Sequence, residues 1–150
     1  MMKTKIMINV AFFLFLLSCQ SSKTEIKEEN KQVQNEVVSD IGIGPIKEVK
    51  LGPIDQSLVS KGKEVFEMKC TACHKLDERF VGPPLRGITK KRKPEWIMNM
   101  ILNPVEMTQK DPIAKQLLAE YLTQMTFQNV SQEEARAILE YFRSIDEEQK

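Results

Sequence analysis

The sequence predicts an all-α domain of four to five short helices over residues 56–150, and two observations support this prediction. Apolar residues beyond position 56 recur at helical spacing. Proline or capping residues stand at the points where such helices would begin. No convincing strand pattern follows residue 55. A small domain rich in Lys and Glu has a thin apolar core, so we expect a large flat ligand at its centre.

The first predicted helix begins near Ser57, its expected capping residue, and runs into Cys70. A loop must follow at Gly82-Pro83-Pro84, because proline disfavours a helical conformation in the residue before it. The first helix is therefore followed by a stretch without regular structure.

Three further helices are predicted beyond this loop. Pro94 is well placed as the first residue of one helix, which Asn103-Pro104 ends. Asp111-Pro112 opens the next helix. Ser131 and Glu134 form a capping box, in which each side chain satisfies a free N–H at the start of the last helix.

The first 18 residues are typical of an export signal that is cleaved off. Lys3 and Lys5 supply its positive start. Residues 6–17 form an apolar run that is too short to span a bilayer, which requires about 20 residues. Leu16-Leu17-Ser18-Cys19 resembles the bacterial lipobox, in which the cysteine carries lipid and becomes the mature N-terminus. An ordinary signal peptide with an incidental cysteine is the alternative.

Residues 19–55 are expected to join a lipid on Cys19 to the domain. Residues 20–40 are polar and lack aromatic side chains, which predicts a disordered tether. Residues 41–55, in which Gly-Pro-Ile occurs twice, are expected to lie as an extended arm on the domain surface. The mature protein would then be anchored in the cell envelope and face the periplasm, with the choice between inner and outer membrane left open.

The charge of the chain excludes one class of function. Lys plus Arg number 22 and Asp plus Glu number 21. Removal of residues 1–18, with Lys3 and Lys5, leaves 20 basic and 21 acidic side chains, a net charge of −1. No large positive field marks the chain as a nucleic-acid binder, so no nucleic-acid partner is expected.

The chemistry of the chain is concentrated in Cys70-Thr71-Ala72-Cys73-His74, a C-x-x-C-H sequence typical of covalent haem c attachment. On a helical turn, Cys70 and Cys73 lie on one face and both reach the vinyl edge of one porphyrin. His74 projects toward the iron as the proximal axial ligand. The motif therefore predicts one haem c with its iron.

Two other interpretations of this motif, a zinc site and a thioredoxin-like redox pair, do not fit the sequence. A closed zinc site needs two more Cys or His ligands, but His74 is the only histidine and no cysteine remains if Cys19 carries lipid. A thioredoxin-like redox pair needs a βαβ setting, which the sequence does not predict. Haem attachment also agrees with export, because haem c is attached outside the cytoplasm.

The single histidine leaves the second axial position to another group. Among the methionines after the motif, Met98 and Met100 belong to the predicted helix from Pro94, where methionine usually fills core gaps. Met107 is expected in a loop, and Met125 is expected in the loop before the last helix. The residues alone leave Met125, Met107 and a vacant position open.

The segment from about Ser57 to Ser144 resembles the class I cytochrome c domain of the small bacterial monohaem kind. Several residues match positions of that family, and they are Gly62 and Phe66 in the first helix, Gly82-Pro83-Pro84-Leu85 in the loop, and Ile138 and Tyr141 in the last helix. The resemblance implies that the Pro83 carbonyl accepts a hydrogen bond from His74. It also implies that Met125 is the distal ligand, although Thr126 stands where many members have proline.

The resemblance further implies a function. A monohaem cytochrome with His74 and Met125 as axial ligands shuttles single electrons between membrane-associated redox complexes, and it is not an enzyme. We expect a monomer that meets redox donor and acceptor proteins in the membrane or periplasm. The alternatives are a fixed haem c subunit of a terminal oxidase or reductase, and a gas sensor or peroxidase-like domain with an open distal site.

Two secondary features carry open expectations. The four cations of residues 90–93 are expected to be a solvated turn before a helix, with docking on an acidic partner or compensation of a haem propionate as alternatives. Trp96 is expected in the core, where its N–H would reach a propionate or another buried acceptor.

Overall fold

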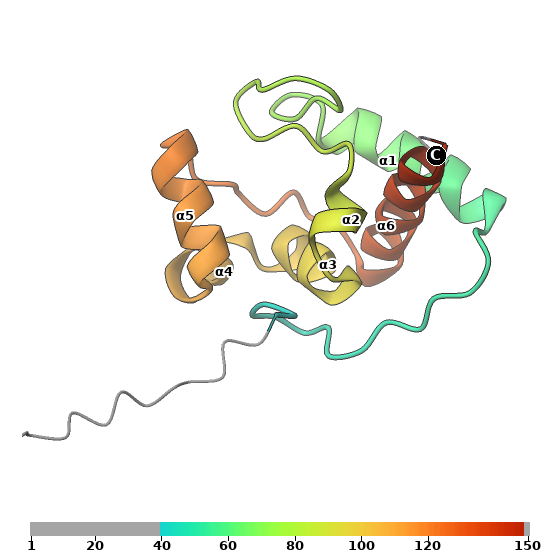
Figure 1. Cartoon of the computed structure of the whole chain (residues 1–150), viewed down its shortest axis with the longest axis horizontal. Helices are drawn as coiled ribbons and strands as arrows, with labels where there is room; N and C mark the ends of the chain where they lie inside the picture. Colours follow the sequence, from blue (N-terminus) through green and yellow to red (C-terminus); the bar gives the residue numbers. More distant parts are fainter. Residues whose placement is uncertain (1–39, 149–150) are drawn as a thin grey trace, which may run out of the picture. The chain divides into compact units, whose positions relative to one another are not determined.

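The computed structural model describes residues 40–148 of the chain. The predicted export signal over 1–18, Cys19 and the tether up to residue 39 lie outside the described residues. Within the described part the fold is all-α and contains no strand, as predicted (Figure 1). The helices are α1 (Gln56–Lys69), α2 (Ile88–Lys91), α3 (Pro94–Leu102), α4 (Pro104–Lys110), α5 (Pro112–Tyr121) and α6 (Gln132–Glu147).

Most helix starts lie where the sequence predicts them. Pro94 and Pro112 each stand in the first turn of a helix, and the capping box at Ser131 is formed in full. The expected cap of α1 was wrong by two residues. The carboxylate of Asp55, not Ser57, accepts the backbone N–H groups at this end, and the Ser57 hydroxyl donates to the same carboxylate.

The sequence did not predict α2 and α4, so the described residues hold six helices instead of four to five. Asn103 ends α3 with non-helical dihedral angles, and Pro104 starts α4 immediately afterwards. Gly87 starts α2 with a left-handed φ of 79°, and this helix has only four residues. Elements this short contain too few apolar positions to show a helical period.

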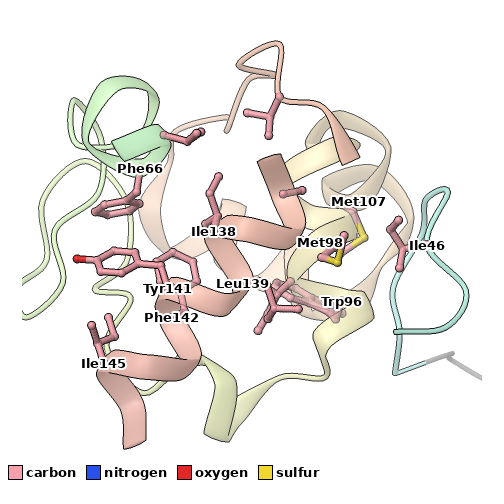
Figure 2. Packing of buried hydrophobic residues seen from close by; sticks show 14 of the residues in the cluster. Ile46, Phe66, Trp96, Met98, Met107, Ile138, Leu139, Tyr141, Phe142 and Ile145 are labelled. Carbon is pink, nitrogen blue, oxygen red and sulfur yellow. The ribbon is translucent and has the colours of Figure 1, made fainter. Parts of the chain in front are cut away.

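Helices α1 and α6 cross at Gly62, and this crossing organises the core. A Cβ at Gly62 would lie 2.0 Å from the carbonyl oxygen of Ala137, so only glycine permits this approach. Beside it, the ring of Phe66 meets Phe142 edge-on, with ring centres 5.5 Å apart, and Tyr141 with ring centres 5.8 Å apart (Figure 2). The crossing fixes the end of α1, where the C-x-x-C-H sequence begins.

The arm before α1 contains no helix or strand, and it contributes to the core. The side chain of Ile46 is buried beside Met107, as Figure 2 shows. Fully buried Asn99 accepts a hydrogen bond from the Ile46 N–H and donates to the carbonyl groups of Ile41 and Ile46, each at 2.9 Å. The arm is therefore fixed on α3 through its backbone.

No helix among residues 40–148 combines the length and the apolar character that crossing a membrane requires.

Candidate haem site

The C-x-x-C-H sequence forms a tight turn at the end of α1. Cys70 caps the helix, and its carbonyl oxygen accepts the backbone N–H groups of Cys73 at 3.1 Å and of His74 at 2.9 Å. The Cys70 side chain is partly buried and that of Cys73 is exposed. Burial raises the pKa of the Cys70 thiol to about 11, which Lys69 partly opposes. The turn presents both thiols and the imidazole from five consecutive residues.

The loop after the turn folds back onto His74. The Gly82 N–H donates to the carbonyl of Cys73 at 2.8 Å. A Cβ at Gly82 would lie 2.5 Å from Cε1 of His74, so glycine lets the backbone lie against the imidazole. Nδ1 of His74 is 3.1 Å from the carbonyl oxygen of Pro83. The structure thus contains the His74–Pro83 contact that the family resemblance implies.

This contact determines which ring nitrogen of the neutral His74 carries the proton. A carbonyl oxygen only accepts, so the hydrogen bond requires the proton on Nδ1 and leaves the lone pair on Nε2. Burial lowers the pKa of His74, and the bond to Pro83 opposes that shift. The ring is therefore neutral near pH 7, the form that binds a metal through Nε2.

His74 opens on a cavity of about 200 Å³ with a mainly apolar lining. Lys69 is the only charged side chain in that lining. The other wall comes from α3, α5, α6 and the segment before α6, with lining residues that include Ile97, Met100, Ile101, Leu117, Leu118, Tyr121, Met125, Ile138 and Phe142.

Met125 lies in this lining, in the segment between α5 and α6. The Thr108 hydroxyl donates to Oε1 of Gln124 at 2.9 Å, and Nε2 of Gln124 donates to the carbonyl of Met125 at 2.8 Å. These two side chains hold the backbone at Met125. Sequence reasoning missed both, because nothing in the local pattern distinguishes Thr108 or Gln124 from other polar residues.

The other methionines occupy different places. Met107 lies in α4, not in a loop as expected, and it is fully buried outside the cavity lining. Its sulfur accepts the Ile43 N–H at 2.9 Å, so it supports the arm. Met98 is core, as expected, whereas Met100 on α3 lines the cavity.

The residues present fit a haem. A flat apolar ring needs a cavity with apolar walls, two thiols at one edge, and an imidazole with a free Nε2, and this cavity provides all three. Among residues 40–148 no buried side-chain nitrogen or oxygen lacks a hydrogen-bond partner. The same residues contain no group of three or more His, Cys, Asp or Glu side chains that would hold a separate metal ion.

Comparison with known proteins agrees with this geometry. The family model described as Cytochrome c matches residues 59–146, which is more than half of the chain. The chain belongs to the cytochrome c family. It is a class I c-type cytochrome, a haem electron-transfer protein that binds one covalently attached haem c with its iron.

Solved cytochrome c structures are similar to this chain over most of the described residues. Cytochrome c from Rhodothermus marinus is 52% identical with a TM-score of 0.70, and the match covers 75% of this chain and 96% of that one. An engineered form of that protein, bound to a carbene intermediate, is 50% identical with a TM-score of 0.66 and coverages of 73% and 95%. A cytochrome c domain from Pseudomonas putida is 27% identical with a TM-score of 0.51, covering 55% and 85%. Among curated proteins, no match was found.

Two secondary expectations need revision. Trp96 is buried, as expected, but its Nε1–H donates to the carboxylate of Asp111 at 3.2 Å and not to a propionate. Lys90 and Lys91 form the last turn of α2, where the helix dipole favours cations, and do not simply precede a helix N-terminus. The guanidinium of Arg92 lies over the Trp96 ring, and Lys93 pairs with Asp40.

Proposed function

We propose that this cytochrome carries single electrons between redox proteins of the cell envelope, with His74 and Met125 as the axial ligands of the iron. Cys70 and Cys73 would hold the haem through thioethers. The observation that carries the proposal is the position of Met125 in the lining of the same cavity as His74. Bound haem c supplies an iron that takes up and releases one electron.

The chain's own residues favour the reduced state. A thioether sulfur is a soft ligand that prefers ferrous iron, and His/Met ligation raises the reduction potential. The apolar lining acts in the same direction, because burial disfavours the additional charge of the oxidised state. The Pro83 carbonyl orients the His74 ring. If His74 and Met125 both bind the iron, they would leave no open position there for a substrate.

The decisive experiment compares two methionines that line the same cavity. Ferric wild-type protein, prepared with its haem, is expected to show the near-infrared sulfur-to-iron charge-transfer band. Met125→Ala should abolish the band and allow the ferrous protein to bind carbon monoxide. Met100→Ala is the matched control and should keep the band. The proposal fails if the band persists in Met125→Ala, or if it disappears in Met100→Ala alone.

A lipid on Cys19 would anchor the mature protein with its domain outside the cytoplasm, as the sequence of residues 1–19 indicates. The mature protein would then begin at Cys19, and Cys19→Ala should remain uncleaved or leave the membrane fraction. Mass spectrometry of the mature N-terminal peptide measures this directly. A free thiol on that peptide would contradict the anchor.

A monomeric mobile carrier is distinguished from a fixed complex subunit by purification. We expect the protein to purify from a mild detergent extract without bound partner proteins and with one haem for each chain. Constant co-purification with an oxidase or reductase would instead favour the fixed subunit.

A further inference from the structure

Helix α5 packs mainly against one other helix. That neighbour is α4 (Figure 1), and α5 is linked to α3 at its start, where Asp111 accepts a hydrogen bond from Trp96; residues of α5 and of α1, α3 and α6 line the same cavity. Leu117, Leu118 and Tyr121 of α5 form part of the cavity lining. The C-terminal end of α5, which leads to Met125, is therefore held by contacts other than packing against these helices.

Arg79, in the loop that follows His74, supplies a link across the cavity. Its guanidinium donates to the backbone carbonyl of Glu120 at 2.9 Å and to the Glu120 carboxylate at 3.3 Å. The guanidinium carbon also lies 4.1 Å from the centre of the Tyr121 ring. Among the residues that the structure describes, no other hydrogen bond joins 75–87 to 112–130.

The geometry gives this link more than the strength of a simple exposed ion pair. The Glu120 carbonyl is one of the last four of α5 and has no partner within the helix, so Arg79 supplies one. A cation at this end also matches the helix dipole, and a guanidinium over a tyrosine ring is attracted by its face. Leu122, the C-cap residue of α5, has a left-handed φ of 54°, which is unfavourable for an L side chain.

Apart from the Thr108–Gln124 bond, the segment that carries Met125 is held at its two ends. Residues 123–130 take part in no backbone-to-backbone hydrogen bond within the described chain. At the far end, Lys69 donates to the carbonyl of Asn129 at 3.0 Å and pairs with Glu134. At the near end, Arg79 fixes Glu120 and Tyr121. Movement of α5 away from the His74 loop would carry Met125 with it.

We propose that Arg79 is a positioning residue that latches α5 to the His74 loop and thereby keeps Met125 in place and external ligands out. The inference rests on the proposed ligation by Met125. A ligand that competes with Met125 binds only the open form, so its apparent affinity rises with the fraction of molecules in which the latch is released.

Imidazole titration of the ferric, haem-loaded protein tests this proposal. Arg79→Gln should bind imidazole about fivefold more tightly than the wild type, a difference of about 1 kcal/mol, because the ion pair, the carbonyl bond and the ring contact are lost together. Glu120→Gln should change the affinity by about twofold or less, since the backbone carbonyl and the ring of Tyr121 remain. Arg79→Lys should fall between the wild type and Arg79→Gln, because lysine keeps the charge without the planar fork.

Arg86→Gln is the matched control. Arg86 also lies in the His74 loop and pairs with an exposed carboxylate, but its partner Asp77 belongs to the same loop. Its removal should leave the imidazole affinity unchanged. Arg79 is exposed, with 55% of its side chain accessible, so the variant should fold with nearly wild-type stability in urea.

The possible outcomes separate the latch from the ligation. Absence of the sulfur-to-iron band in the wild type would refute ligation by Met125, whatever Arg79 does. A normal band in the wild type, with the same imidazole affinity in Arg79→Gln and Arg86→Gln, would refute the latch alone. Equal tightening in both variants would also refute it, because a general charge effect would then explain the change.

Discussion

Gly82 lies against the imidazole of His74, so closely that a Cβ would come within 2.5 Å of Cε1 and 2.8 Å of Nδ1. The neighbouring carbonyl of Pro83 accepts from Nδ1. The absence of a side chain at position 82 is therefore what allows the loop to orient the proposed ligand.

Gly82→Ala should displace the ring or the loop and weaken the His74–Pro83 bond. We expect a loss of about 1 to 3 kcal/mol in the free energy of unfolding, because the added methyl overfills a packed contact. Exchange of the Nδ1 proton of His74, followed by NMR, should become faster. Slow exchange and unchanged stability in the variant would show that the loop does not depend on this contact.

Gly62→Ala tests the crossing of α1 and α6. Its Cβ would meet the Ala137 carbonyl oxygen at 2.0 Å, and a backbone atom cannot rotate away as a side chain does. We expect a destabilisation of about 3 kcal/mol, measured by urea denaturation. Gly52→Ala is the control, because nothing lies within 4 Å of its Cβ, and it should shift stability by about 0.5 kcal/mol or less. Similar values for the two variants would contradict the crossing.

Asn99→Ala tests the attachment of the arm to α3. The variant loses three hydrogen bonds to Ile41 and Ile46 and leaves buried backbone groups without partners. A cost of about 2 to 4 kcal/mol is expected, together with faster proteolysis of residues 40–55. Asn103→Ala removes only one bond to the arm, 3.3 Å to the Ile43 carbonyl, together with its 2.7 Å bond to the Glu106 carboxylate, and should release the arm less. An arm that stays protected in Asn99→Ala would refute this role.

The stability of the protein should depend on pH through Glu134. Its carboxylate accepts from the Ser131 N–H at 2.8 Å and from Lys69, and these bonds hold its pKa below the usual 4.5. The unfolded chain therefore binds this proton more readily, so the contribution of Glu134 is complete above pH 4.5 and is lost as the pH falls through the lower folded-state pKa.

Urea denaturation at several pH values measures this dependence. The wild type should exceed Glu134→Gln by about 0.5 to 1 kcal/mol near pH 7, and the two should converge in acid. Parallel pH profiles for the two proteins would exclude Glu134 as the group that titrates.

Local sequence predicts those features of the protein that depend on contiguous residues. Cys70, Cys73 and His74 stand in one turn, and the capping box of Ser131 and Glu134 spans one helix start, so spacing alone identifies them. Gly62 was identified only through the family resemblance, since a single glycine has several common roles.

What the sequence did not predict depends on partners far along the chain. Trp96 donates to Asp111, Asn99 binds the backbone of the arm, and Arg79 reaches Glu120, and none of these pairs shares a local pattern. The sequence leaves Met107 as an alternative axial ligand, because methionine is equally suited to a hydrophobic core. Its contact with Ile43 became evident only in three dimensions.

The reduced spectrum in alkaline pyridine tests the central claim most directly, because it reports how many vinyl groups of the porphyrin are bonded to sulfur. From a host able to mature c-type cytochromes, the wild type should give the band of a haem with two thioethers. The Cys70→Ser and Cys73→Ser variants should each give the band of a haem with one. A colourless wild-type protein with both thiols free, or one whose haem is extracted by acidic acetone, would contradict the assignment.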